Sequence, residues 1–178
     1  MKWNIKPKTR MNKVKFPAVQ VTAAVVKGEI RMWKYVDGTW RDDDAAFAMY
    51  QDLGKVLKKA YPNHHGRYVV LEDNDPIGYK CAKGMTAKAA CNLRTDDLPK
   101  RSPDLNVLDY CLWHEINKRM REQERTFPRS KKEAMAELKE RLRKTALRLP
   151  TSVVTKAVGD MKRRCQIISK NKGQLLTE

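Results

Sequence analysis

The sequence has few of the residues that build metal centres from sulfur and nitrogen. It contains three histidines and four cysteines, and no two cysteines form a Cys-x-x-Cys pair. A structural zinc site needs about four such ligands at close spacing, so this pattern argues against one. Reduced thiols in an intracellular protein are the expected state of the cysteines, which are Cys81, Cys91, Cys111 and Cys165.

Long apolar runs are absent as well. No stretch approaches the roughly 20 apolar residues that cross a bilayer, and the basic start of the chain lacks the apolar segment of a signal peptide. The sequence therefore predicts a protein without a membrane partner. We expect it to be intracellular, and nuclear if its source is a eukaryote.

Negative charge is scarce relative to positive charge. The 178 residues include 38 Lys and Arg against 21 Asp and Glu, which gives a net charge of +17. Residues 118–172 alone carry 18 basic and six acidic side chains, so the imbalance belongs mainly to the C-terminal part. Such an excess favours a polyanionic partner, with nucleic acid first. A solubilising surface, or a subunit of a larger acidic assembly, would also be basic.

The hydrophobic pattern predicts one domain at 19–173, between a basic arm at 1–18 and a tail at 174–178. β-branched and aromatic residues on both sides of Lys27-Gly28 predict a β-hairpin. Apolar residues at three-to-four spacing then predict a helix, and the acidic triplet at 42–44 fits its N-terminus, where negative charge is favoured.

A short apolar run, RYVVL, predicts a strand that is buried on both faces in the parallel centre of a mixed sheet. The run CNLRT is expected to add a brief strand. Three helices should follow: one capped by Ser102, one opened by a capping box of Ser130 and Glu133, and one from about Ser152. The residues expected to face inward on the last helix are Val154, Val158, Met161, Cys165 and Ile168.

Two aspartates stand out because of where this pattern places them. Asp73 follows the apolar strand directly, at the carboxyl edge of a sheet, where ligands bind in α/β folds. Asp109 lies among Leu108 and Leu112, on or beside the buried stripe of its helix, where a lone carboxylate is costly unless it is paired or bound to metal. A turn before Pro76 would also explain the first acid, and a salt bridge would also explain the second.

The segments around these aspartates resemble those of a known enzyme family. Residues 73–76 read Asp-Asn-Asp-Pro, and residues 99–113 read PKRSPDLNVLDYCLW. The two motifs at this spacing resemble the catalytic domain of mariner-type transposases, within the DDE/D superfamily. The resemblance runs from about Val19 to Gly173 and includes a closing segment, MKRRCQIISKNKG, that is similar to the final helix of the family.

The resemblance implies an RNase H-like α/β fold, with flanking helices on a mixed sheet, and the metal-dependent DNA cleavage and strand transfer of transposition and DNA integration. It implies that Asp73 and Asp109 are catalytic carboxylates that bind Mg²⁺ or Mn²⁺, hard cations that prefer oxygen ligands. DNA is the implied partner, in a homo-oligomer or a larger assembly. The basic residues expected to contact DNA are Lys100, Arg101, Lys162, Arg163 and Arg164.

The sequence departs from the family pattern at its start. The first catalytic aspartate of the family lies on the opening strand of the fold, whereas residues 1–18 contain no acid. We therefore expect an N-terminally truncated fold that lacks the first strand and its aspartate, and a chain that does not cleave DNA alone. The alternative is a non-enzymatic basic nucleic-acid-binding or assembly subunit that has kept the fold. An acid on the first strand would distinguish the two.

Overall fold

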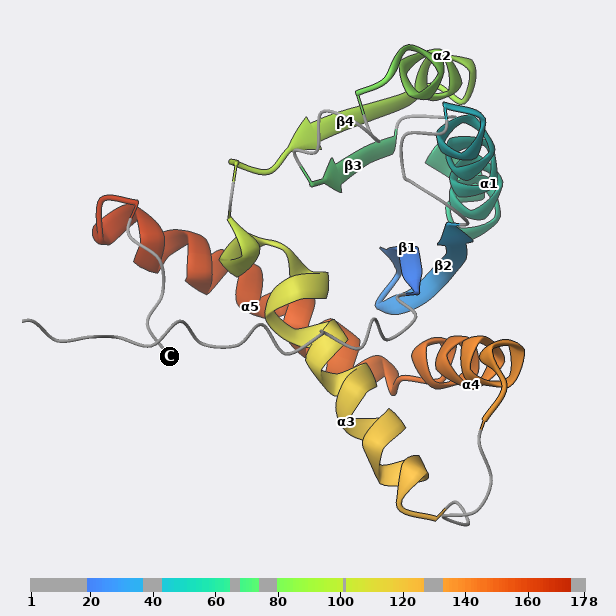
Figure 1. The fold of residues 1–178 in the computed structure, drawn as a ribbon. Helices are drawn as coiled ribbons and strands as arrows, with labels where there is room; N and C mark the ends of the chain where they lie inside the picture. Colours follow the sequence, from blue (N-terminus) through green and yellow to red (C-terminus); the bar gives the residue numbers. More distant parts are fainter. Residues whose placement is uncertain are drawn as a thin grey trace, which may run out of the picture.

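The computed structural model describes residues 19–36, 43–64, 68–73, 80–100, 102–126 and 133–173. Helices and strands follow one another within them in the predicted α/β order (Figure 1). The elements are β1 (Gln20–Val26), β2 (Glu29–Val36), α1 (Asp43–Ala60), η1 (Pro62–His64), β3 (Tyr68–Glu72), α2 (Ala82–Ala90), β4 (Leu93–Asp97), η2 (Pro103–Leu105), η3 (Leu108–Leu112), α3 (Trp113–Glu124), α4 (Met135–Leu147) and α5 (Thr151–Lys170). The predicted arm at 1–18 and tail at 174–178 lie outside the described residues.

The predicted β-hairpin is present. β1 and β2 pair antiparallel, and Val26 pairs with Glu29 across a two-residue turn. Both turn residues have positive φ, 53° at Lys27 and 71° at Gly28, as a type I′ turn requires. The backbone twist of this turn matches that of the strands, so two residues are enough to close the hairpin.

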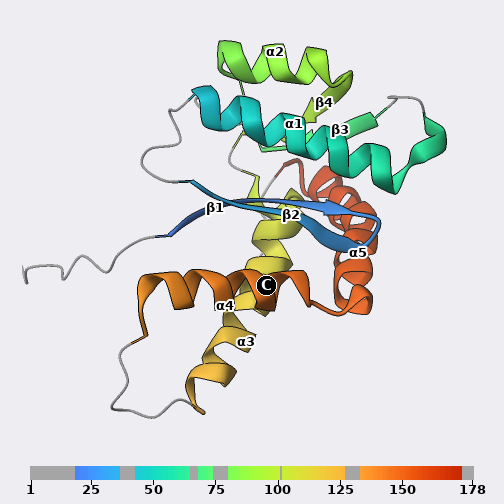
Figure 2. The ribbon, with the colours of Figure 1, turned by 90° about the vertical axis from the view of Figure 1, so that its right-hand side faces the viewer.

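The hairpin is the layer that two clusters of buried side chains share. One cluster joins it to α1, α2, β3 and β4, and contains Met32, Tyr50 and Leu93. The other joins it to α3, α4 and α5, and contains Ile30 and Leu112. Figure 2 shows the result, with the hairpin between α1 on one side and α4 on the other.

The described strands form an antiparallel pair, β1–β2, and a parallel pair, β3–β4. The prediction that β3 is buried on both faces is wrong, because Val69 and Leu71 are 59% and 52% exposed. Only the face that carries Tyr68 and Val70 packs on the core. A continuous apolar run is compatible with burial of both faces but does not require it. In this protein, no described residues cover the second face of β3.

The helix predicted from Ser102 is irregular before it becomes α3. η2 is a 3-10 turn and η3 is a π-helical turn. The Ser102 side chain makes no cap and instead donates to the carbonyl of Pro99. Asn106 takes the capping position, since its Oδ1 accepts the N–H of Leu108 at 3.1 Å. π-helical turns occur frequently at functional sites, and this one contains Asp109.

The start of α4 also differs from the prediction. Of the two capping-box residues, Ser130 lies outside the described residues. Glu133 precedes the helix and pairs with Arg141 at 2.7 Å, so it is not the N3 residue of a cap. Glu137 takes that position, and its Oε2 accepts the backbone N–H of Ala134 at 3.2 Å. The helix therefore begins later than the spacing predicted.

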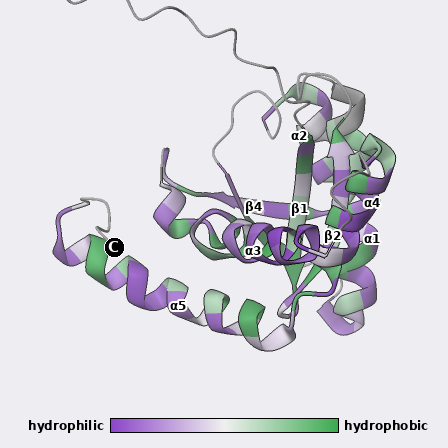
Figure 3. Ribbon diagram, turned by 60° about the horizontal axis from the view of Figure 1, so that its bottom comes forward, coloured by the Kyte–Doolittle hydropathy of each residue, from purple (hydrophilic) through white to green (hydrophobic). Residues whose placement is uncertain are grey.

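α5 begins near the predicted residue, but its buried stripe is rotated. Val154, Ala157 and Arg164 are buried, whereas Val158 is 44% exposed and Cys165 is exposed. The inward positions predicted for Val158 and Cys165 are therefore wrong. Arg164 can occupy the stripe because its aliphatic stem packs like an apolar side chain. Figure 3 shows hydrophobic and hydrophilic residues mixed along this helix. No described helix is both long and apolar enough to cross a membrane.

Candidate metal centre

Three acidic residues meet at the carboxyl ends of the parallel strands. β3 ends at Glu72 and continues into Asp73, and Glu72 stands beside Asp97 in the register of β4. The carboxyl edge of parallel strands is where α/β folds place ligands. The partners of each acid decide which of them is available to bind one.

The side chain of Glu72 is buried, and its carboxylate is paired with other side chains. It is 7% exposed, it forms an ion pair with the Nζ of Lys88, and its Oε2 accepts the hydroxyl of Tyr50 at 2.8 Å. Lys88 is 4% exposed and lies over the Tyr50 ring, 4.9 Å from its centroid. A buried carboxylate with a cation and a hydroxyl donor is satisfied, so Glu72 is unavailable as a metal ligand in this conformation.

Asp97 is also paired with a lysine, at the surface of the protein. Its Oδ2 lies 2.7 Å from the Nζ of Lys80. Asp73, by contrast, is exposed and makes no ion pair within the described part of the chain. Of the three acids at this edge, Asp73 is therefore the one whose charge is left for a further ligand.

The charge of Asp73 acts on the carboxyl group of Asp109. Burial raises the pKa of the Asp109 carboxyl above its ordinary value, and the negative charge of Asp73 raises that pKa further. Hydrogen bonds with the side chains of Trp113 and Asn106 lower it in part. Two carboxylates that repel each other in this way are stabilised by a cation bound between them.

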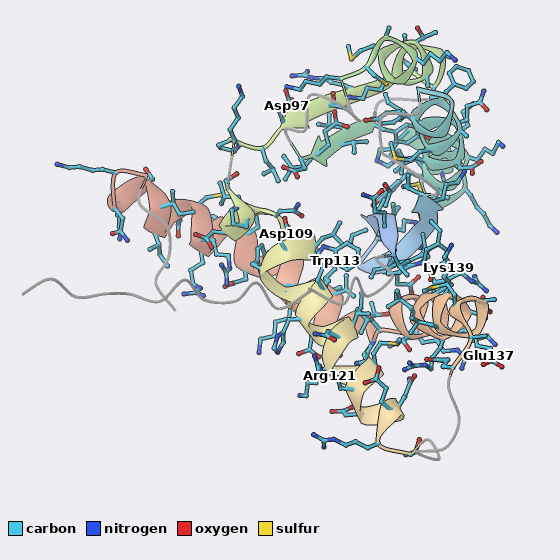
Figure 4. The ribbon with its side chains drawn as sticks, in the orientation of Figure 1. Asp97, Asp109, Trp113, Arg121, Glu137 and Lys139 are labelled. Atoms are coloured by element: carbon cyan, nitrogen blue, oxygen red, sulfur yellow. The ribbon has the colours of Figure 1, made fainter. Side chains whose placement is uncertain are left out.

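Asp109 is held by its own helix and opens into a cavity. In Figure 4 it lies on the helical segment that faces the carboxyl ends of β3 and β4, while Trp113 extends toward the hairpin. The Trp113 ring packs edge-on against Trp33, with ring centroids 5.7 Å apart. A cavity of about 380 Å³ beside Asp109 is lined by Pro103, Asp104, Asp109, Tyr110 and His114.

The sequence placed Asp109 on or beside the buried stripe, and this was only partly right. Leu112 and Ile116 form the stripe, while the Asp109 residue is exposed at its edge and only its carboxyl group is partly shielded from water. Asp104 and Glu115 are half-buried. The π-helical turn explains the position of Asp109, because it shifts the angular positions of residues 108–112 relative to α3.

The donor set fits a hard divalent cation. Asp73 and Asp109 offer oxygen ligands alone, which suits Mg²⁺ or Mn²⁺. Within the described residues, no three His, Cys, Asp or Glu side chains gather as a set of metal ligands. The described residues therefore show no complete set of metal ligands, and the chemistry of the two carboxylates suits a hard cation.

The basic residues expected to contact DNA lie in different surroundings. Lys100 and Lys162 are exposed, and Arg163 is exposed but binds Asp160 through Nε at 2.7 Å. Arg164 is not a surface residue, because it is 9% exposed. Its Nε lies 2.9 Å from Asp160, and its guanidinium lies over the Tyr110 ring, 4.0 Å from the centroid. Arg164 is therefore held inside the fold in this conformation, and Arg101 lies outside the described residues.

Sequence reasoning missed the lysines that neutralise the other strand-end acids. Lys88 is the one charged residue of α2 that is buried, in a segment that reads AKGMTAKAA. Lys88 lies beside Gly84 and Ala87 on the buried face of α2, and this position is the only sign in the sequence that Lys88 could be buried. The sign is weak because a lysine at the edge of a buried face usually extends to solvent. The partner across the fold, Tyr50, has no signal in the sequence around either acid.

The fold matches solved structures of a mariner transposase. The crystal structure of the catalytic domain of Mos1 mariner transposase gives a TM-score of 0.73 at 13% sequence identity, over 89% of this chain and 76% of that chain. The Mos1 catalytic domain with raltegravir and Mg gives 0.73 at 13% identity, over 89% and 77% of the two chains. The Mos1 mariner paired-end complex with Mn gives 0.75 at 13% identity, over 99% of this chain and 52% of that chain.

This chain thus spans about three quarters of the Mos1 catalytic domain and about half of the longer chain in the paired-end complex. Comparisons with protein-family models and with curated proteins give no match. The structural likeness confirms the fold that the two motifs predicted: the chain has the RNase H-like fold of the mariner transposase catalytic domain.

Proposed function

We propose that this chain is a transposase-derived DDE/D domain that binds DNA and holds one divalent cation between Asp73 and Asp109. The observation that carries the proposal is the electrostatic coupling of these two carboxylates at the carboxyl end of β3. Similar folds occur in the Mos1 paired-end complex with Mn and in a Mos1 strand transfer complex, which supports DNA as the ligand. The net charge of +17 supports it independently.

Each residue has a distinct task in this proposal. Asp73 and Asp109 bind the cation, while the side chains of Asn106 and Trp113 act on the Asp109 carboxyl and lower its pKa in part. The buried Glu72–Lys88 pair anchors the end of β3, from which Asp73 projects. A bound Mg²⁺ or Mn²⁺ supplies Lewis-acid stabilisation of charge on a phosphate oxygen.

Cleavage by this chain alone is not part of the proposal. Enzymes of the DDE/D type use two divalent cations, and cations a few ångströms apart repel each other unless carboxylates bridge them. The described residues offer Asp73 and Asp109 but no third acid near them that lacks a partner. We propose that full strand cleavage and transfer need a further carboxylate or an oligomeric assembly.

The second candidate is a non-enzymatic basic subunit that binds nucleic acid and has kept the fold. The observation in its favour is the same lack of a three-acid set within the described residues. The two candidates differ in metal affinity, because a subunit that has lost the chemistry has no reason to retain a cation between Asp73 and Asp109.

Mn²⁺ titration followed by electron paramagnetic resonance tests the proposal. The wild-type chain should bind about one Mn²⁺, and Asp73→Asn and Asp109→Asn should each abolish that binding. Asp96→Asn is the matched control, because this β4 aspartate is exposed and lies 4.0 Å from Arg94. Equal Mn²⁺ binding by wild type and both site variants would favour the non-enzymatic subunit.

A further inference from the structure

A polar cleft lies between the C-terminal turns of α3 and α4, away from the candidate metal centre. It has a volume of about 400 Å³ and is lined by Arg119, Glu122, Gln123, Thr126, Lys144, Thr145 and Arg148. Three of these residues are cationic and one is acidic, so the cleft carries a net positive charge. None of them belongs to the set of DNA contacts predicted from the sequence.

The floor of the cleft is built by a contact between the two helices. Thr145 is 6% exposed, and its Oγ1 accepts the Nε2 N–H of Gln123 at 3.2 Å. The Thr126 hydroxyl donates to the Gln123 carbonyl at 2.7 Å and closes the end of α3. Arg141 crosses between the helices on their other side, where it binds Glu133 at 2.7 Å and the Met120 carbonyl at 3.2 Å. The cleft is therefore a fixed feature of the helix pair.

Arg119 provides the second observation. Its Nε is buried and has no hydrogen-bond partner in the described part of the chain. Other arginines nearby are satisfied, since Arg141 binds Glu133 and Arg143 binds Glu140. A shielded guanidinium N–H without an acceptor is costly, so the site is incomplete without an acceptor that the described residues do not supply.

Favourable interaction with the helix dipole explains the positions of only some of the three cationic residues in the cleft. Lys144 lies in the last turn of α4 and Arg148 is its C-cap, where cations are favoured by the partial negative charge of the helix end. Arg119 lies before the last turn of α3, whose basic residue is Arg121. The dipole of α3 therefore does not explain why Arg119 lines the cleft.

We propose that this cleft binds one backbone phosphate of DNA, with Arg119, Lys144 and Arg148 as the cationic ligands. The inference rests on the proposed DNA-binding function and assigns part of it to a specific place. Phosphate oxygens would accept guanidinium N–H groups of Arg119 and Arg148, and the Gln123 amide, which gives one N–H to Thr145, has a second to donate. Glu122 at the same rim disfavours a second phosphate and limits the site to one.

The test compares two double variants that remove the same charge. Arg119→Gln with Arg148→Gln empties the cleft of two cations. Lys118→Gln with Arg121→Gln removes two exposed cations from α3, and Arg121 is about 200° around the helix from Arg119. Figure 4 marks the position of Arg121 on α3. Binding of a fluorescent DNA duplex is measured by anisotropy as a function of salt concentration.

The cleft variant should bind about three- to tenfold more weakly than wild type near 0.1 M salt, with a salt slope reduced by about one. The control variant should bind within about twofold of wild type, since exposed cations far from a phosphate contribute little. An equal loss in both double variants overturns the cleft and leaves DNA binding intact. Wild-type chain without salt-dependent DNA binding overturns the proposed function itself.

A folding control keeps the comparison valid. Arg148→Gln alone changes an exposed side chain and should leave the melting temperature unchanged while it reproduces part of the loss in affinity. If this single variant melts like wild type and binds DNA with the wild-type slope, the cleft assignment is wrong.

Discussion

Lys88 and Glu72 form a buried ion pair, and Glu72 directly precedes Asp73 in the sequence. The pair joins α2 to the end of β3, and Tyr50 completes it from α1 through a 2.8 Å hydrogen bond to Glu72. Three elements that are distant in the sequence are thus fixed at the point where the candidate metal ligand begins. A change in this pair should therefore affect both the stability of the fold and the position of Asp73.

Lys88→Met should destabilise the protein by about 3 to 5 kcal/mol, because it leaves the Glu72 carboxylate buried without a cation. Adding Glu72→Gln to that variant should restore most of the loss, since an amide pairs with the Tyr50 hydroxyl without a buried charge. Urea unfolding followed by circular dichroism measures both. Lys58→Met is the control at an exposed position of α1 and should change stability by less than about 0.5 kcal/mol. Equal stability of Lys88→Met and wild type would contradict the importance of the pair.

Two glycines should respond to the same substitution with opposite signs. Gly28 has φ +71°, and a Cβ there would lie 2.5 Å from Cγ2 of Thr155 on α5. Gly28→Ala should therefore destabilise the protein by about 1 to 2 kcal/mol from the backbone alone, with the clash in addition. Gly159 lies within α5, where an added Cβ meets nothing within 4 Å, so Gly159→Ala should stabilise by up to about 1 kcal/mol. Thermal melting of the two variants tests both predictions. Melting temperatures that shift in the same direction in both variants would contradict them.

Asp109→Asn should raise the stability of the metal-free protein at neutral pH. The pKa of Asp109 is raised in the folded state, so the folded chain holds this proton more tightly than the unfolded chain does. Stability is therefore lost as pH rises from the ordinary carboxyl value through the raised one, and it stays lower above that range. Solvent screening keeps the gain from the substitution below about 1 kcal/mol.

Melting curves of Asp109→Asn and wild type, recorded with EDTA across the acidic range, measure this effect. The two proteins should melt alike where the carboxyl of Asp109 is protonated in both states, and the variant should melt higher at neutral pH. Asp96→Asn is the control and should show no such divergence. A variant that melts below wild type at neutral pH would show that the charge of Asp109 stabilises the fold.

The parts of the fold that local signals specify were predictable. The hairpin followed from its turn and its β-branched residues, and α1 followed from apolar spacing that places Tyr50, Leu53 and Leu57 in the core. The two motifs around Asp73 and Asp109 predicted the fold that the structural comparison confirms. Local patterns of this kind succeed when neighbouring residues supply the stabilising contacts.

Features that depend on distant contacts were not predictable. Arg164 is buried because Tyr110 lies under its guanidinium, and this contact rotates the stripe of α5 away from Val158. The sequence of β3 is typical of a strand that is buried on both faces, yet Val69 is exposed. Its burial depends on which elements pack beside the strand, and the sequence of the strand does not determine that. The pairing of Glu72 with Lys88 likewise arises only when α2 packs on the strand ends.

The chain with Mg²⁺ or Mn²⁺ should not cleave DNA at a rate that depends on Asp73 and Asp109. Two carboxylates can hold one cation, but a pair of cations needs a bridging acid to offset their repulsion. Glu72 and Asp97 lie at the same edge and are held by Lys88 and Lys80. The assay follows the nicking of supercoiled plasmid by wild type, Asp73→Asn and Asp109→Asn. Nicking by wild type that both substitutions abolish would show that the site is complete. Double substitutions with Glu72→Gln or Asp97→Asn would then identify the acid that leaves its lysine to join it.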